Sequence, residues 1–207
     1  MFDRAERRSG YQVSEVAEPD PCLLQLAAQL AGEPSTDRPA CVHPVLSALA
    51  RAVRDHTSTE GRAALKPLAN DLVATAQPGL ETCARLVAMC VSTALASPEQ
   101  SRVTSDERKR LCAARSTALH LLERTCAALP SNEQSGARPC GAARWWLPVL
   151  GRCRLDEPFY RCFVAPEQVA EAVAVTARAT GVDCDRRLRE LLKLSIRVVP
   201  SSGRRHG

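Results

Sequence analysis

Aromatic side chains are scarce in this chain of 207 residues: Phe, Trp and Tyr together make up 3%. A buried core therefore has to consist of aliphatic and small side chains, which let helices approach one another closely. No stretch of useful length alternates apolar and polar residues as a half-buried strand does. The abundance of Ala and Leu favours helices. These features together predict an all-α fold.

Long apolar runs are also missing. No run approaches the roughly 18 to 20 residues that cross a bilayer, and the N-terminal sequence MFDRAERRSG lacks the apolar segment of a secretory signal. We therefore expect a cytoplasmic protein with no membrane partner. In a reducing compartment, most of the ten cysteines are expected to be reduced and buried as small hydrophobic residues.

Motifs that bind a cofactor or carry out catalysis are not found. The sequence contains no C-x-x-C pair, no glycine-rich dinucleotide or phosphate loop, and no HExxH or GxSxG motif. We therefore predict no cofactor, and a non-enzymatic role is favoured over a catalytic one.

The net charge of +5 comes almost entirely from arginine, since Lys66, Lys109 and Lys193 are the only lysines. High Ala, Arg and Pro with little Lys is the amino-acid usage that a GC-rich genome produces. Acidic residues are also interspersed with the arginines along the chain, so the charge forms no long basic block. Nucleic acid is therefore a possible partner but not the favoured one.

Helical periodicity and turn residues divide the chain into about seven helices. Pro67 predicts a kink or a break inside the third helix, and the pair Thr104 and Glu107 forms a capping-box pattern before the fifth. The predicted helices cover about 21–31, 44–56, 59–73, 79–97, 105–129, 166–179 and 183–198. The predicted organisation is an irregular bundle with a smaller C-terminal part: a flexible arm (1–20), a helical bundle (21–130), a linker (131–141), a C-terminal helical part (142–199) and a disordered basic tail (200–207).

One compact group of candidate metal ligands is present, at Cys41 and His43. Zinc needs three or four ligands at fixed geometry, and Cys83, Cys90 or His120 would have to supply the others. The alternative is structural: Cys41 is buried, and the His43 ring bonds a free backbone donor at the start of the helix that begins near Pro44. The shortage of paired ligands favours the structural interpretation.

A thiol enzyme would need a nucleophile and a base in contact. Cys112 and His120, with Glu123 as an orienting acid, have suitable chemistry. However, eight residues along one helix separate the cysteine from the histidine by about 12 Å, which is too far for direct proton transfer. The sequence therefore does not favour catalysis by these residues.

Most of the aromatic residues cluster in the C-terminal part, where they form either a small core or a contact surface. Trp145 and Trp146 are adjacent, so on a helix their rings would point about 100° apart. With Phe159 and Tyr160 nearby, an exposed Trp would form part of a partner-binding surface. Burial in a core is the favoured interpretation for at least one of the two indoles.

Binding to DNA is a further alternative. The helices predicted at 166–179 and 183–197 are joined by a short turn at Gly181, as in a helix-turn-helix. The residues that would contact phosphates are Arg186 and Arg187 on the second helix and Arg204 and Arg205 in the tail.

The stretch CVHPVLSALARAVRDHTSTEGRAALKPLANDLVATA, residues 41–76, resembles a segment of uncharacterised helical proteins from high-GC actinobacteria. In that pattern a His-Pro helix is followed by a helix that starts with Ser or Thr. The resemblance implies a bacterial, cytosolic protein and implies no activity. The matching residues are His43, Pro44, Asp55, Ser58, Arg62, Pro67 and Leu68.

The sequence therefore favours a non-catalytic helical interaction module, an adaptor, regulator or accessory factor, that binds another protein or a second copy of itself. The alternatives are a DNA-binding regulator that uses the C-terminal helical hairpin, and a metal-binding or thiol enzyme that uses Cys41 and His43.

Overall fold

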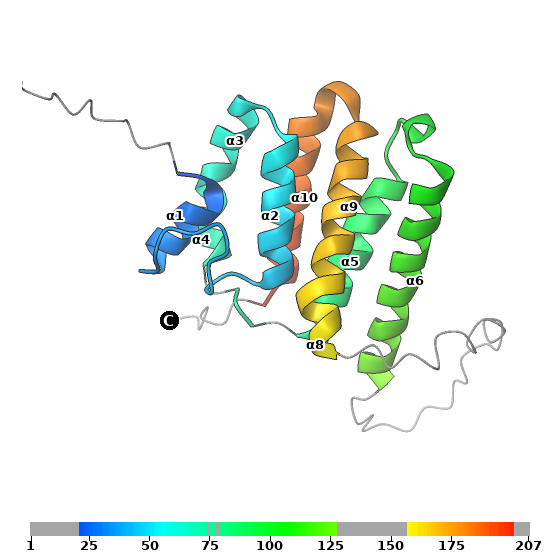
Figure 1. Cartoon of the computed structure of the whole chain (residues 1–207), viewed down its shortest axis with the longest axis horizontal. Coiled ribbons are helices and arrows are strands. Elements are labelled where there is room, and N and C mark those ends of the chain that lie inside the picture. The colour runs from blue at the N-terminus through cyan, green and yellow to red at the C-terminus, as the bar shows by residue number, and fades with distance from the viewer. Residues whose placement is uncertain (1–20, 74, 78, 128–156, 201–207) are drawn as a thin grey trace, which may run out of the picture.

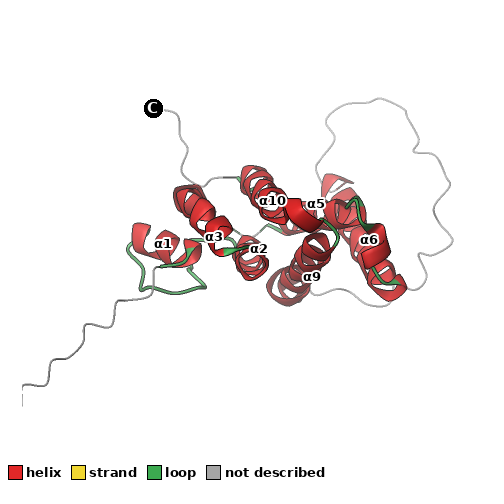
Figure 2. Ribbon diagram, turned by 90° about the horizontal axis from the view of Figure 1, so that it is seen from above, coloured by secondary structure: helices red, strands yellow, loops and turns green. Residues whose placement is uncertain are grey.

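The computed structural model describes residues 21–73, 75–77, 79–127 and 157–200. Within these ranges every regular element is helical and no strand occurs (Figures 1 and 2). The predicted all-α fold is confirmed. Residues 1–20, the linker at 131–141 and the tail from residue 201 lie outside the described residues.

The helices follow one another along the chain with short connections. The α-helices are α1 (Leu23–Leu30), α2 (Pro44–His56), α3 (Thr59–Leu65), α4 (Ala69–Leu72), α5 (Leu80–Leu95), α6 (Ser105–Ala127), α8 (Glu157–Phe159), α9 (Ala165–Arg178) and α10 (Cys184–Val198). A π-helix, Tyr160–Val164, joins α8 to α9, and 3₁₀ turns lie at Lys66–Leu68, Gln100–Arg102 and Gly181–Asp183.

Local sequence signals account for several helix boundaries. Pro67 lies in the 3₁₀ turn that separates α3 from α4, so the predicted break is confirmed. The capping box before α6 is also formed: the backbone N–H of Glu107 donates to Thr104 Oγ1 over 3.2 Å, and the N–H of Thr104 donates to the Glu107 carboxylate over 3.0 Å. Gly181 has a φ of +68° at the turn between α9 and α10, a conformation that favours glycine.

The five long helices form one bundle. Helix α5 packs against α6, α9 and α10, and α2 packs against α9 and α10 on the other side (Figures 1 and 2). Helix α9 therefore contacts both α2 and α5. The described residues of the predicted C-terminal part, 157–199, belong to the same bundle as those of 21–127, because α2 cannot cover its apolar face without α9 and α10.

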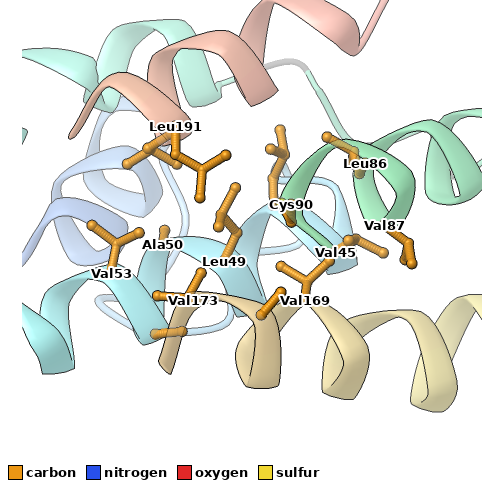
Figure 3. Packing of buried hydrophobic residues seen from close by; sticks show 14 of the residues in the cluster. Val45, Leu49, Ala50, Val53, Leu86, Val87, Cys90, Val169, Val173 and Leu191 are labelled. Atoms are coloured by element: carbon orange, nitrogen blue, oxygen red, sulfur yellow. The ribbon is translucent and has the colours of Figure 1, made fainter. Parts of the chain in front are cut away.

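The core is aliphatic and tightly packed, as the shortage of aromatic residues predicts. Leu49 of α2, Cys90 of α5, Val173 of α9 and Leu191 of α10 meet in its centre (Figure 3). Each of these side chains is at most 2% exposed. A fully buried Leu or Val contributes about 1.5 to 3 kcal/mol through burial.

Ion pairs connect α6 to α9. Arg178 of α9 pairs with Glu107 of α6, and Arg110 of α6 contacts the Glu171 carboxylate of α9 over 2.7 Å. Among the described residues, no helix is long and apolar enough to cross a bilayer.

The sequence CRLDEPFYRCF, residues 153–163, shows no helical period and predicts an irregular segment, but its described part is helical. From Glu157 onwards the chain is helical, with a π-helix at Tyr160–Val164. An extra residue in a helical turn re-aims the side chains around it, and such turns are frequent at functional sites.

Candidate functional site

His43 is fully buried and caps the first turn of α2. Its Nδ1 accepts a hydrogen bond from the backbone N–H of Val45 at 3.2 Å. Its own backbone N–H donates to Thr75 Oγ1 at 3.2 Å. Pro44 follows at the first helical position, where the missing N–H costs nothing. The structural role expected for His43 at the helix N-terminus is confirmed.

The position of the ring proton follows from these contacts. Burial, together with the positive charge of Arg161, lowers the pKa of His43 to about 4, so the ring is neutral at pH 7. A neutral imidazole carries one proton. Because Nδ1 accepts from Val45, the proton must be on Nε2, which lies 3.7 Å from Sγ of Cys83 on α5.

This tautomer limits the chemistry of the pair. An Nε2 that carries a proton donates to the sulfur and cannot remove the thiol proton. Burial also raises the pKa of the Cys83 thiol to about 12, so the nucleophilic thiolate is not formed at neutral pH. A metal bound at Nε2 would require the proton on Nδ1, facing the Val45 N–H. The geometry therefore supports neither a Cys–His catalytic pair nor a metal at His43.

Cys41, the other predicted metal ligand, has a different partner. Its half-buried thiol lies 3.8 Å from the carbonyl oxygen of Ala27 in α1, whereas the His43 ring faces Val45 and Cys83. Burial and the nearby Glu33 raise the pKa of Cys41. Within the described ranges, no three His, Cys, Asp or Glu side chains are grouped in a way that could hold a metal.

Tyr160, the first residue of the π-helix, is also fully buried, and its hydroxyl has no hydrogen-bond partner. Burial raises the pKa of its phenol. We predicted that this residue contacts a partner, and the structure corrects that prediction: the ring belongs to the core. An unpaired buried hydroxyl is costly, so the Tyr160 hydroxyl opposes stability while burial of its ring favours it.

Phe159 and Phe163 lie on the other side of the same segment and are exposed. Their side chains are 52% and 63% exposed, and their rings stack with centroids 5.4 Å apart. The other large exposed hydrophobic residues are on different elements: Leu30, Leu119, Val182 and Leu194. The two phenylalanines thus form the one aromatic pair exposed on the described surface. Trp145 and Trp146 lie outside the described residues.

A groove runs beside Phe163, between α2 and the segment that joins the π-helix to α9. It consists of two adjoining hollows of about 430 and 480 Å³, which share Arg51, Cys162, Phe163 and Pro166. The first hollow is bordered by the loop from Arg38 to Val42, and the second continues along α2 and α9 past Ala52 and Ala170. We call this surface the α2–α9 groove.

Arg51 is the charged residue common to both hollows. One guanidinium nitrogen, Nη1, donates to the carbonyl oxygen of Asp37 and to Oγ of Ser47, each over 3.0 Å. Partial burial and the charge of Arg38 lower the pKa of Arg51, which remains a cation at neutral pH. The groove therefore combines a held guanidinium with exposed aromatic surface, the two residue types that dominate protein interfaces.

A third hollow of about 570 Å³ lies beside the last turn of α10. Asp71, Lys193 and Arg197 line it together with Leu68, Ile196, Val199 and Pro200. No aromatic residue faces it, so it offers less to a partner than the α2–α9 groove.

Two of the four arginines predicted to contact nucleic acid, Arg186 and Arg187, have partners within the protein. Arg186 pairs with Asp183 over 2.9 Å, and Arg187 donates to the carbonyl oxygen of Ala96 at the end of α5 over 3.4 Å. Arg204 and Arg205 lie outside the described residues. Helices α9 and α10 run side by side in opposite directions (Figure 1), whereas a helix-turn-helix needs a steep crossing.

The residues considered for a thiol enzyme, Cys112 and His120, lie on α6 and are not part of the buried His43–Cys83 pair. Cys112 is exposed on α6, and His120 contacts Glu123 on the same helix at 4.0 Å. The seven cysteines whose side chains the structure describes are all free; two are fully buried, two are exposed and three are intermediate. The expectation that most thiols are buried is therefore wrong for the described cysteines.

Sequence reasoning missed the α2–α9 groove. Its α2 wall includes Ala48, Arg51, Ala52 and Asp55, which follow the i, i+3, i+4, i+7 spacing of one helix face. This spacing could have indicated a shallow surface with small side chains around an arginine. No family model, no curated protein and no solved structure matches the chain.

Proposed function

We propose that this protein is a non-catalytic helical interaction module that binds another protein through the α2–α9 groove and the exposed Phe159–Phe163 pair. The observation that carries the proposal is this stacked, exposed pair in a chain with only 3% aromatic residues. Leaving two adjacent Phe rings in water costs free energy, which a bound partner would recover.

The shape of the groove supports the same function. Ala48, Ala52 and Ala170 keep its walls low, so an apolar side chain of a partner can lie beside the Phe163 ring. Partially buried Arg51 has already lost part of its hydration, so a partner hydrogen bond to it costs less desolvation. The module thus resembles other helical surfaces on which a few aromatic and arginine residues supply most of the binding energy.

The chemistry of the buried cluster supports a binding role over a catalytic one. The neutral His43 and the protonated Cys83 form a structural hydrogen bond inside the bundle. The seven described thiols are free, which fits the reducing, cytoplasmic compartment that we propose for the protein.

The first test is site-specific crosslinking. A benzophenone amino acid replaces Phe163 in cells of the native host, and the same amino acid replaces Leu194 on α10 as the matched control, since Leu194 is 49% exposed. The proposal predicts one discrete crosslinked protein from position 163 that position 194 does not give.

The second test uses the purified crosslinked protein. The double substitution Phe159→Ser and Phe163→Ser should weaken its binding at least about 30-fold, the effect of losing a hot spot worth about 2 kcal/mol, while Leu194→Ser leaves it unchanged. Unchanged binding by the double variant contradicts the proposal. A crosslink to a second copy of the chain would replace the proposed partner by self-association. Salt-sensitive binding to duplex DNA that survives the double substitution would favour the nucleic-acid alternative.

A further inference from the structure

We infer that His43 is a positioning residue for the α2–α9 groove, because a single tautomer of its ring ties the first turn of α2 to α5. The inference deepens the proposed function, since it concerns the wall of the same groove. Its first part, the clamp itself, is independent of any partner.

Both ring nitrogens of His43 are used, and they require opposite roles. Nδ1 accepts from the N–H of Val45 in α2, and Nε2 faces Sγ of Cys83 in α5. A neutral ring can satisfy both contacts only as the Nε2–H tautomer, in which one nitrogen accepts and the other donates. The ring thus links the start of α2 to α5 through two residues that are 40 positions apart in the sequence.

The backbone of His43 adds a third connection. Its N–H donates to Thr75 Oγ1, and the Thr75 hydroxyl in turn donates to the carbonyl oxygen of Leu72 at the end of α4 over 2.7 Å. The side chain of Thr75 is 1% exposed. The start of α2 is therefore held from α4 and from α5 by hydrogen bonds that water does not reach.

The groove begins at this point of the fold. Val42 and Pro44, the two neighbours of His43, line its first hollow together with Ser47 and Phe163. Ser47 accepts the hydrogen bond from Arg51. A shift in the first turn of α2 would therefore move one wall of the groove and the residue that holds the Arg51 guanidinium.

The first experiment reads the proton directly. Long-range ¹H–¹⁵N correlation spectra of the full chain at pH 7 distinguish the protonated ring nitrogen from the unprotonated one, and the His43→Asn variant assigns the signals by their loss. The expected result is a single Nε2–H tautomer for His43. A proton on Nδ1, or a mixture of both tautomers, would overturn the inference.

The second experiment measures the clamp by amide exchange. In His43→Ala the Val45 amide should exchange about fivefold to tenfold faster relative to the Ala118 amide in α6, as expected when a cap is lost. His43→Asn restores a cap acceptor and should return the Val45 rate most of the way to the wild-type rate. Equal Val45 exchange in wild type and His43→Ala would sink the inference. If His43→Ala does not fold, the wild-type tautomer and the Asn variant still decide it.

The two proposals fail in different ways. The tautomer and the Val45 exchange are measured without a partner, so they test the clamp alone. Binding of the crosslinked protein to the Phe159→Ser and Phe163→Ser double variant tests the proposed function alone. If both hold, His43→Ala should also weaken that binding, and His43→Asn should weaken it less.

Discussion

Cys83 and Cys90 lie two turns apart on α5, and comparing them shows what the surrounding residues do to a buried thiol. Both are fully buried, and burial raises the pKa of both to about 12. Cys90 lies among aliphatic side chains such as Leu49 and Leu191 (Figure 3), and its polar neighbour is the buried Ser195 hydroxyl of α10, which lowers the thiol pKa less than burial raises it. Cys83 lies beside His43, in a region that also contains the unpaired hydroxyl of Tyr160.

The comparison teaches that a neighbouring histidine does not activate a thiol by proximity. Beside Cys83, the His43 ring is itself buried, and its unprotonated nitrogen Nδ1 already accepts the hydrogen bond that caps α2. The pKa of His43 is lowered to about 4, whereas a catalytic base needs a pKa near neutrality. The surroundings of Cys83 therefore differ from those of Cys90 in two ways: they hold the first turn of α2 through His43, and they contain a group whose titration changes stability.

The largest expected effect concerns how slowly the two buried thiols, Cys83 and Cys90, react compared with exposed ones. In native protein, Cys112 and Cys162, which are exposed, should react with a maleimide at least about 100-fold faster than Cys83 and Cys90, because the buried thiols react only after opening. Mass spectrometry of peptides gives the rate for each cysteine. Rapid labelling of Cys83 alone would show that its end of the bundle is open.

The next largest effect is that of a cavity in the aliphatic core near Cys90. Leu49→Ala should lower the free energy of unfolding by about 2 to 5 kcal/mol, since Leu49 is 0% exposed among close-packed side chains. Urea unfolding measures the change. The matched control is Leu119→Ala on α6, where the side chain is 43% exposed and the expected loss is about 0.5 kcal/mol or less. Similar losses in both variants would contradict the described core.

The titration of His43, beside Cys83, should lower the free energy of unfolding by about 3 kcal/mol as the pH falls. The folded-state pKa of His43, about 4, is lower than the unfolded value of 6.5, so between these values the unfolded chain binds the proton first. The stabilisation from neutral His43 is fully present above about pH 6.5 and is lost as the pH falls towards 4.

Urea unfolding at pH 7, 5.5 and 4 measures this loss. His43→Asn, which caps α2 but does not titrate, is the control: it should be less stable than wild type at pH 7, and its stability should fall less between pH 7 and 4. Parallel curves for the two proteins would contradict the assignment of this pH dependence to His43.

The smallest expected effect comes from the unpaired hydroxyl. Tyr160→Phe should leave the free energy of unfolding unchanged or raise it by up to about 1 kcal/mol, because the hydroxyl loses its hydration on folding without gaining a partner. Thermal and urea unfolding detect the change. A loss of more than about 1 kcal/mol would mean that the hydroxyl has a hydrogen-bond partner in solution.

Structural features that depend on residues close together in the sequence could be predicted from it. Helical periodicity identified the long helices, Pro67 the break after α3, and the pair Thr104 and Glu107 the cap of α6. The cap by His43 was also accessible, because the ring and the Val45 N–H are two positions apart.

Features that depend on distant residues were not predictable. The contact of His43 with Cys83 spans 40 positions, and the groove forms only when α9 packs against α2. The π-helix at Tyr160–Val164 adds one residue to a helical turn, and at its start Tyr160 is buried whereas the adjacent Phe159 is exposed. No periodic pattern of hydrophobic residues encodes that single extra residue in the turn.

The packing of α2 against α9 also determines when this protein can fold during its synthesis. The two helices are more than 100 residues apart in the sequence, so a ribosome that adds about 5 to 20 residues per second needs roughly 5 to 20 s to make α9 after α2. Throughout this interval the apolar face of α2 lacks α9, the helix that covers most of it. Contacts of such long sequence separation also slow folding itself. The nascent chain thus presents this face to chaperones and to other chains until α9 and α10 have been made.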